Sequence, residues 1–197
     1  MAVETITVVS DISKGIPASM PSGTHYTCLD ESTLNTLDYV YGTWAEWTTD
    51  YYGVADHSVG SGTINKITMY GVFSQYGGGG GAHCNFGIKT GGTDYMNGGF
   101  QASSSPTLYS KEWSINPKTG VAWTWDDIDA LQAIVSLSRV ASSQYSFCYQ
   151  IYIQVDYTEA EQGWANIAKF SGATAADLAK VLGIAVADCS KISGVAV

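Results

Sequence analysis

A run of alternating apolar residues at positions 145–157 constrains the fold of this chain more than any other stretch. The run reads YSFCYQIYIQVDY, and its alternate positions hold Tyr145, Phe147, Tyr149, Ile151, Ile153, Val155 and Tyr157. Side chains two residues apart on a β-strand point to the same side of a sheet. The run therefore predicts a strand with one buried face, formed by these seven side chains.

The composition favours further strands joined by glycine turns. The 197 residues include 22 glycines, 12% aromatic residues and only 14% charged residues, unlike a helical protein rich in Ala, Leu, Glu and Lys. Other strands are expected at residues 1–10, 24–29, 64–76, 84–90, 93–96, 108–115 and 133–140. With about nine or ten strands at this spacing, the sequence predicts a mainly β fold, an antiparallel jelly-roll-like β-sandwich over residues 1–158.

Two short motifs predict how some of these strands are connected. Residues 116–120 read NPKTG, in which the proline and the glycine suit a tight turn. Thr124 and Asp127 have the spacing of a capping box, with Asp in place of Glu, and predict one or two helical turns. Asp126 and Asp129 are then expected as carboxylates favoured by the N-terminal end of that helix.

The last part of the chain, residues 159–197, is predicted to be a separate tail of helical-turn repeats. Three 11-residue copies begin at Asn166, Asp177 and Asp188, each with Lys fourth and Gly seventh. Asn or Asp at the start and Gly near the end predict short capped helical turns. Such repeats cannot bury their apolar side alone, so we expect the tail to mediate self-association. The expected interface residues are Ile167, Phe170, Leu178, Val181, Ile184, Ile192 and Val195.

The charge balance disfavours several classes of partner. A formal net charge of -9 with only 9 basic residues leaves little to neutralise phosphates, so we expect no nucleic-acid partner and no membrane insertion. No segment approaches the roughly 18 apolar residues of a membrane span. The first residues lack the pattern of a secretory signal, so the chain is either processed or folds in the cytoplasm.

The glycine run at 77–81 lacks the Gly-Lys-Ser/Thr of a phosphate-binding loop and is interpreted as a hairpin tip.

No pattern in the sequence points to catalysis or to a cofactor. His25, His57 and His83 form none of the paired spacings of a metal site, and no nucleophile motif is present. We therefore expect a protein that is not an enzyme, with no catalytic residue, cofactor or metal. A glycan-active enzyme is a third hypothesis, because sandwich glycosidases assemble their pair of catalytic carboxylates across strands. The cysteines are Cys28, Cys84, Cys148 and Cys189. They are expected to be buried thiols, although four cysteines also permit three disulfide pairings.

One aromatic segment, residues 40–52, admits two interpretations. Its rings include Trp44, Trp47, Tyr51 and Tyr52. Aromatic rings stack on the apolar faces of sugars, so these four residues are candidates for glycan binding. The alternative is that they fill the sandwich core or a subunit interface, where aromatic residues dominate the energetics.

The pattern Trp113-x-Ile-Asn-Pro-x-Thr-Gly-x-Ala-Trp-Thr-Trp125, followed by residues 150–157, resembles a β-sandwich module of tailed-phage and metagenomic proteins. The tail resembles short repeats at the ends of phage appendage and virion proteins. The resemblance implies a non-enzymatic structural protein of a virion or similar extracellular assembly, made in the host cytoplasm. Its partners would be copies of itself, other virion proteins and a host-surface glycan. The alternative function is that of a carbohydrate-binding adhesin.

Overall fold

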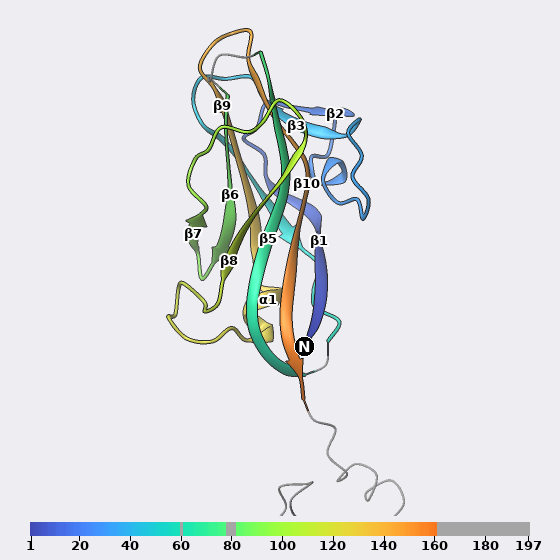
Figure 1. Cartoon of the computed structure of the whole chain (residues 1–197), viewed down its shortest axis with the longest axis vertical. Coiled ribbons are helices and arrows are strands. Elements are labelled where there is room, and N and C mark those ends of the chain that lie inside the picture. The colour runs from blue at the N-terminus through green and yellow to red at the C-terminus, as the bar shows by residue number, and fades with distance from the viewer. Residues whose placement is uncertain (60, 78–81, 161–197) are drawn as a thin grey trace, which may run out of the picture. The chain divides into compact units, whose positions relative to one another are not determined.

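In the computed structural model, Met1–Glu159 form one compact unit. The structure describes residues 1–59, 61–77 and 82–160 (Figure 1). The predicted repeat tail, its self-association and its interface residues from Ile167 to Val195 lie outside the described residues, as does Cys189.

Within the described residues, ten antiparallel strands form two sheets packed face to face (Figure 1). Sheet A contains, in order, β8 (Thr107–Trp113), β5 (Gly62–Tyr76), β10 (Tyr145–Glu159), β3 (Tyr39–Gly42) and β2 (Ala18–Met20). Sheet B contains β4 (Thr48–Val54), β9 (Gln132–Arg139), β6 (Ala82–Thr90) and β7 (Thr93–Met96). The predicted antiparallel β-sandwich is therefore confirmed.

The first strand, β1 (Ala2–Ser13), belongs to both sheets. Residues 2–7 pair with β10 in sheet A. From Val8 onward the strand pairs with β4 in sheet B, and register shifts accompany the crossing. Ile6 and Val8 are buried on either side of the point where the strand changes sheets. The two sheets are thus joined along one side of the sandwich by a single continuous strand, β1.

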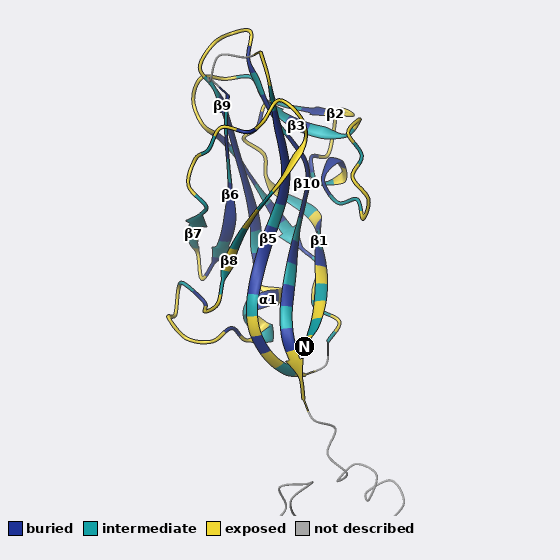
Figure 2. Ribbon diagram, viewed as in Figure 1, coloured by how far each residue is buried: buried dark blue, intermediate teal, exposed yellow. Residues whose placement is uncertain are grey.

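The core lies between the two sheets (Figure 2). Phe73 of β5 stacks on Phe86 of β6, with ring centroids 5.4 Å apart, and so links sheet A to sheet B. Phe100 meets both rings edge-on, at 5.6 and 5.9 Å. Burying one such side chain stabilises a fold by roughly 1.5–3 kcal/mol.

Three cysteines also lie in this interior. Cys28, Cys84 and Cys148 are buried free thiols, which confirms the interpretation of these three residues as buried hydrophobes. Burial raises the pKa of each thiol, because the thiolate would lose its hydration.

The alternation predicted for residues 145–157 holds only for their second half. Ile151, Ile153 and Val155 are buried in the core, as expected. A β-bulge between Cys148 and Gln150 shifts the register by one residue. An extra residue reverses which side chains point inward, so Cys148 enters the core and Tyr145, Phe147 and Tyr149 lie on the outer side. The prediction of burial was wrong for Tyr145 and Phe147, which are only partly buried, whereas Tyr149 is 8% exposed and therefore buried, although on the outer side.

Two predicted local motifs are confirmed. Gly120 N donates to Asn116 O at 2.8 Å, and the φ of 74° at Gly120 favours glycine in this tight turn. Helix α1 (Trp125–Asp129) begins with the predicted capping box. Asp127 N donates to Thr124 Oγ1 at 3.1 Å, and Thr124 N donates to Asp127 Oδ2 at 3.0 Å.

One other local prediction is wrong. Residues 24–29 contain the 3-10 helix η1 (Tyr26–Cys28) in place of a strand. The Asp11 carboxylate accepts the backbone N–H groups of His25 and Tyr26, so a distant side chain satisfies donors that a strand would pair. The glycine run at 77–81, interpreted as a hairpin tip, lies outside the described residues from position 78 to 81. The flanking strands β5 and β6 belong to different sheets. Within the described ranges, no helix has the length and apolar character needed to cross a bilayer.

Candidate functional site

Three rows of side chains cross the outer side of sheet B, where strands run in the order β4, β9 and β6. Strand register places Thr49, Ser136 and Asn85 in one row and Tyr51, Ile134 and Gly87 in the next. Ser138 pairs with His83, and Trp47, which precedes β4, extends this third row. We call these nine residues the sheet B face.

The Trp47 indole spans the third row. Its Cζ2 and Cη2 atoms lie 3.2 and 3.4 Å from the position that a Cβ on Gly99 would occupy. Gly99 is next to Phe100, which pairs with Cys84 on the far side of β9. The indole therefore crosses β9, which explains why the outward-facing Ser138 is only 3% exposed. Trp47 itself stays 47% exposed and so presents a flat apolar surface to solvent.

The Tyr51 ring closes the opposite end of the sheet B face. Its hydroxyl donates to Asp94 Oδ2 at 2.7 Å, and Lys89 Nζ lies 4.8 Å from the ring centroid. The ring thus reaches from β4 over Ile134, which is fully buried although it points outward. The hydrogen bond to the Asp94 carboxylate raises the pKa of the Tyr51 hydroxyl, because that bond needs the proton.

Between the two rings lies a row of uncharged polar groups. Thr49 Oγ1 and Ser136 Oγ are 2.8 Å apart and hydrogen-bonded. Beside them, Asn85 Oδ1 is buried and has no hydrogen-bond partner among the described residues. An unpaired buried amide oxygen costs about 1–3 kcal/mol, so such a group needs an explanation. His83 belongs to the third row, opposite Ser138, and its ring centroid lies 6.3 Å from that of Trp47.

The four aromatic residues that the sequence offers as glycan-binding candidates therefore lie in three different places. Trp47 and Tyr51 belong to the sheet B face. Trp44 is 57% exposed in the turn between β3 and β4, where its carbonyl oxygen accepts from Arg139 N at 2.9 Å. Tyr52 has no exposed surface, so its ring cannot stack on a ligand, and the alternative interpretation as a core residue holds for it. Alternation along β4 explains the separation of Tyr51 and Tyr52.

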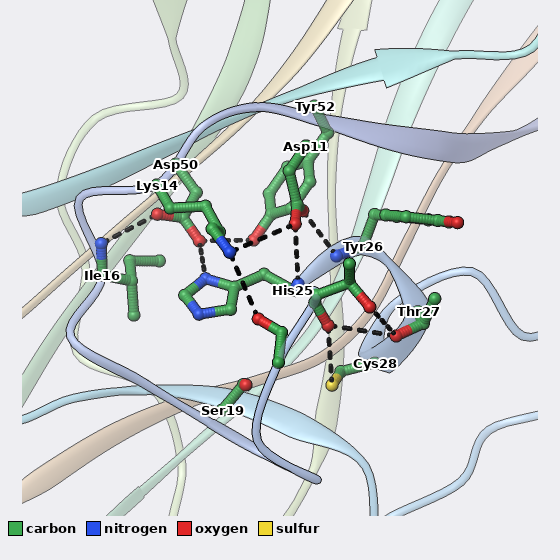
Figure 3. A network of polar contacts seen from close by, with 12 residues as sticks. Asp11, Lys14, Ile16, Ser19, His25, Tyr26, Thr27, Cys28, Asp50 and Tyr52 are labelled. Atoms are coloured by element: carbon green, nitrogen blue, oxygen red, sulfur yellow. Dashed lines mark hydrogen bonds and ion pairs between the residues drawn. The ribbon is translucent and has the colours of Figure 1, made fainter.

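Tyr52 belongs to a buried polar network centred on Asp50 (Figure 3). Asp50 is fully buried, and its carboxylate accepts Gly15 N at 2.7 Å, Ile16 N at 2.8 Å and the Tyr52 hydroxyl at 2.7 Å. His25 Nδ1 lies 2.6 Å from Asp50 Oδ2. Burial and the adjacent Asp50 charge raise the pKa of Tyr52. Since the Asp50 oxygens are all engaged with the protein's own groups, this network holds the chain before β2 and the η1 region against β4.

The other sequence candidates do not converge on a reactive site. His25, His57 and His83 lie in separate surroundings, with Asp50, Asp129 and Trp47 as their respective neighbours. Across the described ranges, no group of three or more His, Cys, Asp and Glu side chains is arranged to hold a metal ion.

No family model matches this sequence, and no curated protein matches it. Among solved structures, a family 35 carbohydrate-binding module from Cellvibrio japonicus is 12% identical, with a TM-score of 0.39 over 80% of this chain and 95% of that one. A family 61 module in complex with β-1,4-galactotriose is 9% identical, with a TM-score of 0.37 over 77% and 86%. A Stig cyclase from Fischerella is 13% identical, with a TM-score of 0.35 over 78% and 90%. At such low values, similarity carries no argument about what this chain binds.

Proposed function

We propose that the β-sandwich binds carbohydrate on the sheet B face, with Trp47 as the stacking platform. The observation that carries the proposal is the Trp47 indole, which lies across β9 and keeps nearly half of its surface exposed. A single exposed apolar residue needs no explanation. A flat ring beside a row of uncharged polar groups matches the mixed surface of a sugar ring, although the unpaired Asn85 Oδ1 is itself buried.

The chemistry of a saccharide fits this arrangement. One face of a pyranose carries C–H groups, which pack on an aromatic ring, and its edge carries hydroxyls that both donate and accept. Thr49 and Asn85, which are partly exposed, offer a hydroxyl and an amide group at that edge, and neither is charged. Ser136 is buried and holds the Thr49 hydroxyl through their hydrogen bond. The charged pair Lys89 and Asp94 is engaged with Tyr51 at the end of the face. A neutral glycan is therefore the ligand that the face suits best.

The test compares two exposed tryptophans. The full chain is screened on an array of neutral glycans, and the best ligand is titrated by calorimetry into wild type, Trp47→Ala and Trp44→Ala. Trp44→Ala is the matched control, since Trp44 lies outside the three rows. We expect Trp47→Ala to weaken binding at least about tenfold, or about 1.4 kcal/mol, with Trp44→Ala unchanged. An array without any bound glycan, or equal affinity of Trp47→Ala and wild type, would refute the proposal.

The virion role implied by the sequence resemblance stays a prediction. It depends on self-association through the tail, whose residues 161–197 lie outside the described ranges. Its measurement is the molecular mass in solution across protein concentrations, with and without that segment.

A further inference from the structure

The outer side of sheet A contains a trough of about 270 Å³ that is separate from the sheet B face. Side chains from four neighbouring strands, β1, β10, β5 and β8, line it. The two central strands supply its floor, where register places Gln154 opposite Thr68 and Tyr152 opposite Tyr70. Glu112 of β8 stands beside Thr68 and forms part of one wall.

The polar groups of the floor are not engaged with the rest of the protein. Among the described residues, neither Gln154, Thr68 nor the Tyr70 hydroxyl has a hydrogen-bond partner for its side chain. None of these side chains contains a buried unsatisfied atom either, so their donors and acceptors are open to the trough. The Tyr70 ring is held by stacking on Tyr152, with centroids 5.0 Å apart and planes inclined by 14°. A rigid ring and free hydroxyl and amide groups suit a polyhydroxylated ligand.

The charged side chains that line the trough favour a positively charged ligand. Lys66 Nζ lies 2.6 Å from Glu112 Oε2, so these two charges neutralise each other. Asp156 accepts a hydrogen bond from Asn65 Nδ2 at 2.9 Å and has no ion-pair partner within the described part of the chain. Lys66 also lies across the strand from Asp156, so one lysine faces two carboxylates and one net negative charge remains beside the floor. A ligand with one positive charge would balance it.

We propose that this sheet A trough binds a sugar residue that carries a free ammonium group, as in a deacetylated amino sugar. The ammonium group faces the Asp156 carboxylate, the hydroxyls bond to Gln154 and Thr68, and the sugar packs beside Tyr70. This site does not require that the sheet B face bind a glycan, because the two share no residue.

The experiment titrates oligomers of glucosamine, and their fully N-acetylated counterparts, into the full chain by calorimetry. We expect the glucosamine oligomer to bind and the acetylated one, which lacks the charge, to bind at least about tenfold more weakly. Asp156→Asn should remove that preference, and Lys66→Met, which deletes the competing cation, should strengthen binding of the glucosamine oligomer. Trp47→Ala should leave this binding unchanged, which separates the site from the sheet B face.

A second control addresses general attraction of a cation to a chain with a net charge of -9. Glu46→Gln removes an exposed carboxylate outside the trough. If it weakens binding as much as Asp156→Asn, the attraction is general and the proposal is wrong. Equal affinity for the two oligomers, or no binding of either, would also overturn it. Thermal unfolding of each variant establishes that the fold is retained. Lys66→Met is an independent test, because it should strengthen binding of the glucosamine oligomer, and a misfolded variant would not do so.

Discussion

The imidazole of His57 lies 2.6 Å from the Asp129 carboxylate, measured from Nδ1 to Oδ1, and its ring stacks on Trp125 with centroids 4.8 Å apart. The backbone N–H of His57 donates to the same carboxylate oxygen at 2.9 Å. Asp129 ends α1, so its carboxylate fastens the segment after β4 to this helix. The sequence-based expectation of a carboxylate stabilising the helix N-terminus was wrong for Asp129.

This pair predicts a pH-dependent contribution to stability. The hydrogen bond to Asp129 raises the pKa of His57 above 6.5, and the hydrogen bonds from His57 lower the pKa of Asp129 below 3.8. The His57 contribution is complete below pH 6.5 and is lost as the pH rises through the higher folded-state pKa. The Asp129 contribution is complete above pH 3.8 and is lost as the pH falls through the lower folded-state pKa.

Urea unfolding of wild type and His57→Gln should therefore differ most between pH 3.8 and 6.5, and the difference should shrink on both sides. His83→Gln is the matched control, since His83 has no ion-pair partner in the described ranges. A difference between wild type and His57→Gln that stays constant with pH would contradict the assignment.

The Asp50 network predicts a strong effect of a single substitution. Asp50→Ala leaves two backbone N–H groups, the Tyr52 hydroxyl and His25 Nδ1 without their acceptor in a buried place. Each buried group left unpaired costs about 1–3 kcal/mol, so the free energy of unfolding should fall by at least about 3 kcal/mol. Urea denaturation measures this loss. The exposed Asp56→Asn should change it by less than about 0.5 kcal/mol, and an equally small effect of Asp50→Ala would refute the role of the network.

The buried thiols predict slow chemical modification. Cys84 and Cys148 have no exposed surface, and burial raises the pKa of both thiols, so little thiolate is available for reaction. In a Cys189→Ser variant, an aromatic disulfide reagent should label Cys28, Cys84 and Cys148 only as fast as the protein unfolds. Urea should then make all three react rapidly. Fast labelling of the native protein would show that the core is more accessible than the structure indicates.

Substitution by alanine should affect stability differently at Gly87 and at Gly99. A Cβ on Gly87 would collide with the carbonyl oxygen of Tyr95 and lie 2.8 Å from the Met96 Cα, so Gly87→Ala must displace the backbone of β7. Overpacking of this kind costs about 1–3 kcal/mol in the free energy of unfolding. A Cβ on Gly99 would meet only the Trp47 ring at 3.2 Å, and a side chain can move. Gly99→Ala should therefore preserve stability, measured by thermal unfolding, but weaken glycan binding. The reverse order of stabilities would contradict this reading of the two contacts.

Local features were predictable because the residues that create them are neighbours in sequence. The capping box at Thr124 and the turn closed by Gly120 need only contacts within five residues, and both form as expected. The sequence was enough to predict a strand at 145–157, but not which of its side chains point into the core. The bulge depends on pairing with β5, which the spacing within one strand does not reveal.

The candidate site was predictable only in its aromatic part. Trp47 and Tyr51 stand out in a segment dense in rings, whereas Asn85 and His83 reach the same surface only through the pairing of β9 with β6. Likewise, nothing near Asp50 in the sequence indicates its partners, since His25 and Gly15 lie 25 and 35 positions away. Long-range register decides these contacts, and it is set by the packing of the whole sandwich.

The passage of β1 from one sheet to the other has a consequence for truncated chains. Removal of residues 1–13 would uncover the backbone groups of β10 that pair with residues 2–7 and those of β4 that pair beyond Val8. Exposed N–H and C=O groups along a strand edge recruit strands of other molecules. A chain that lost this one strand would therefore have two new unpaired sheet edges, one on each sheet. Strands of other molecules could pair at both edges, which would produce open-ended aggregates.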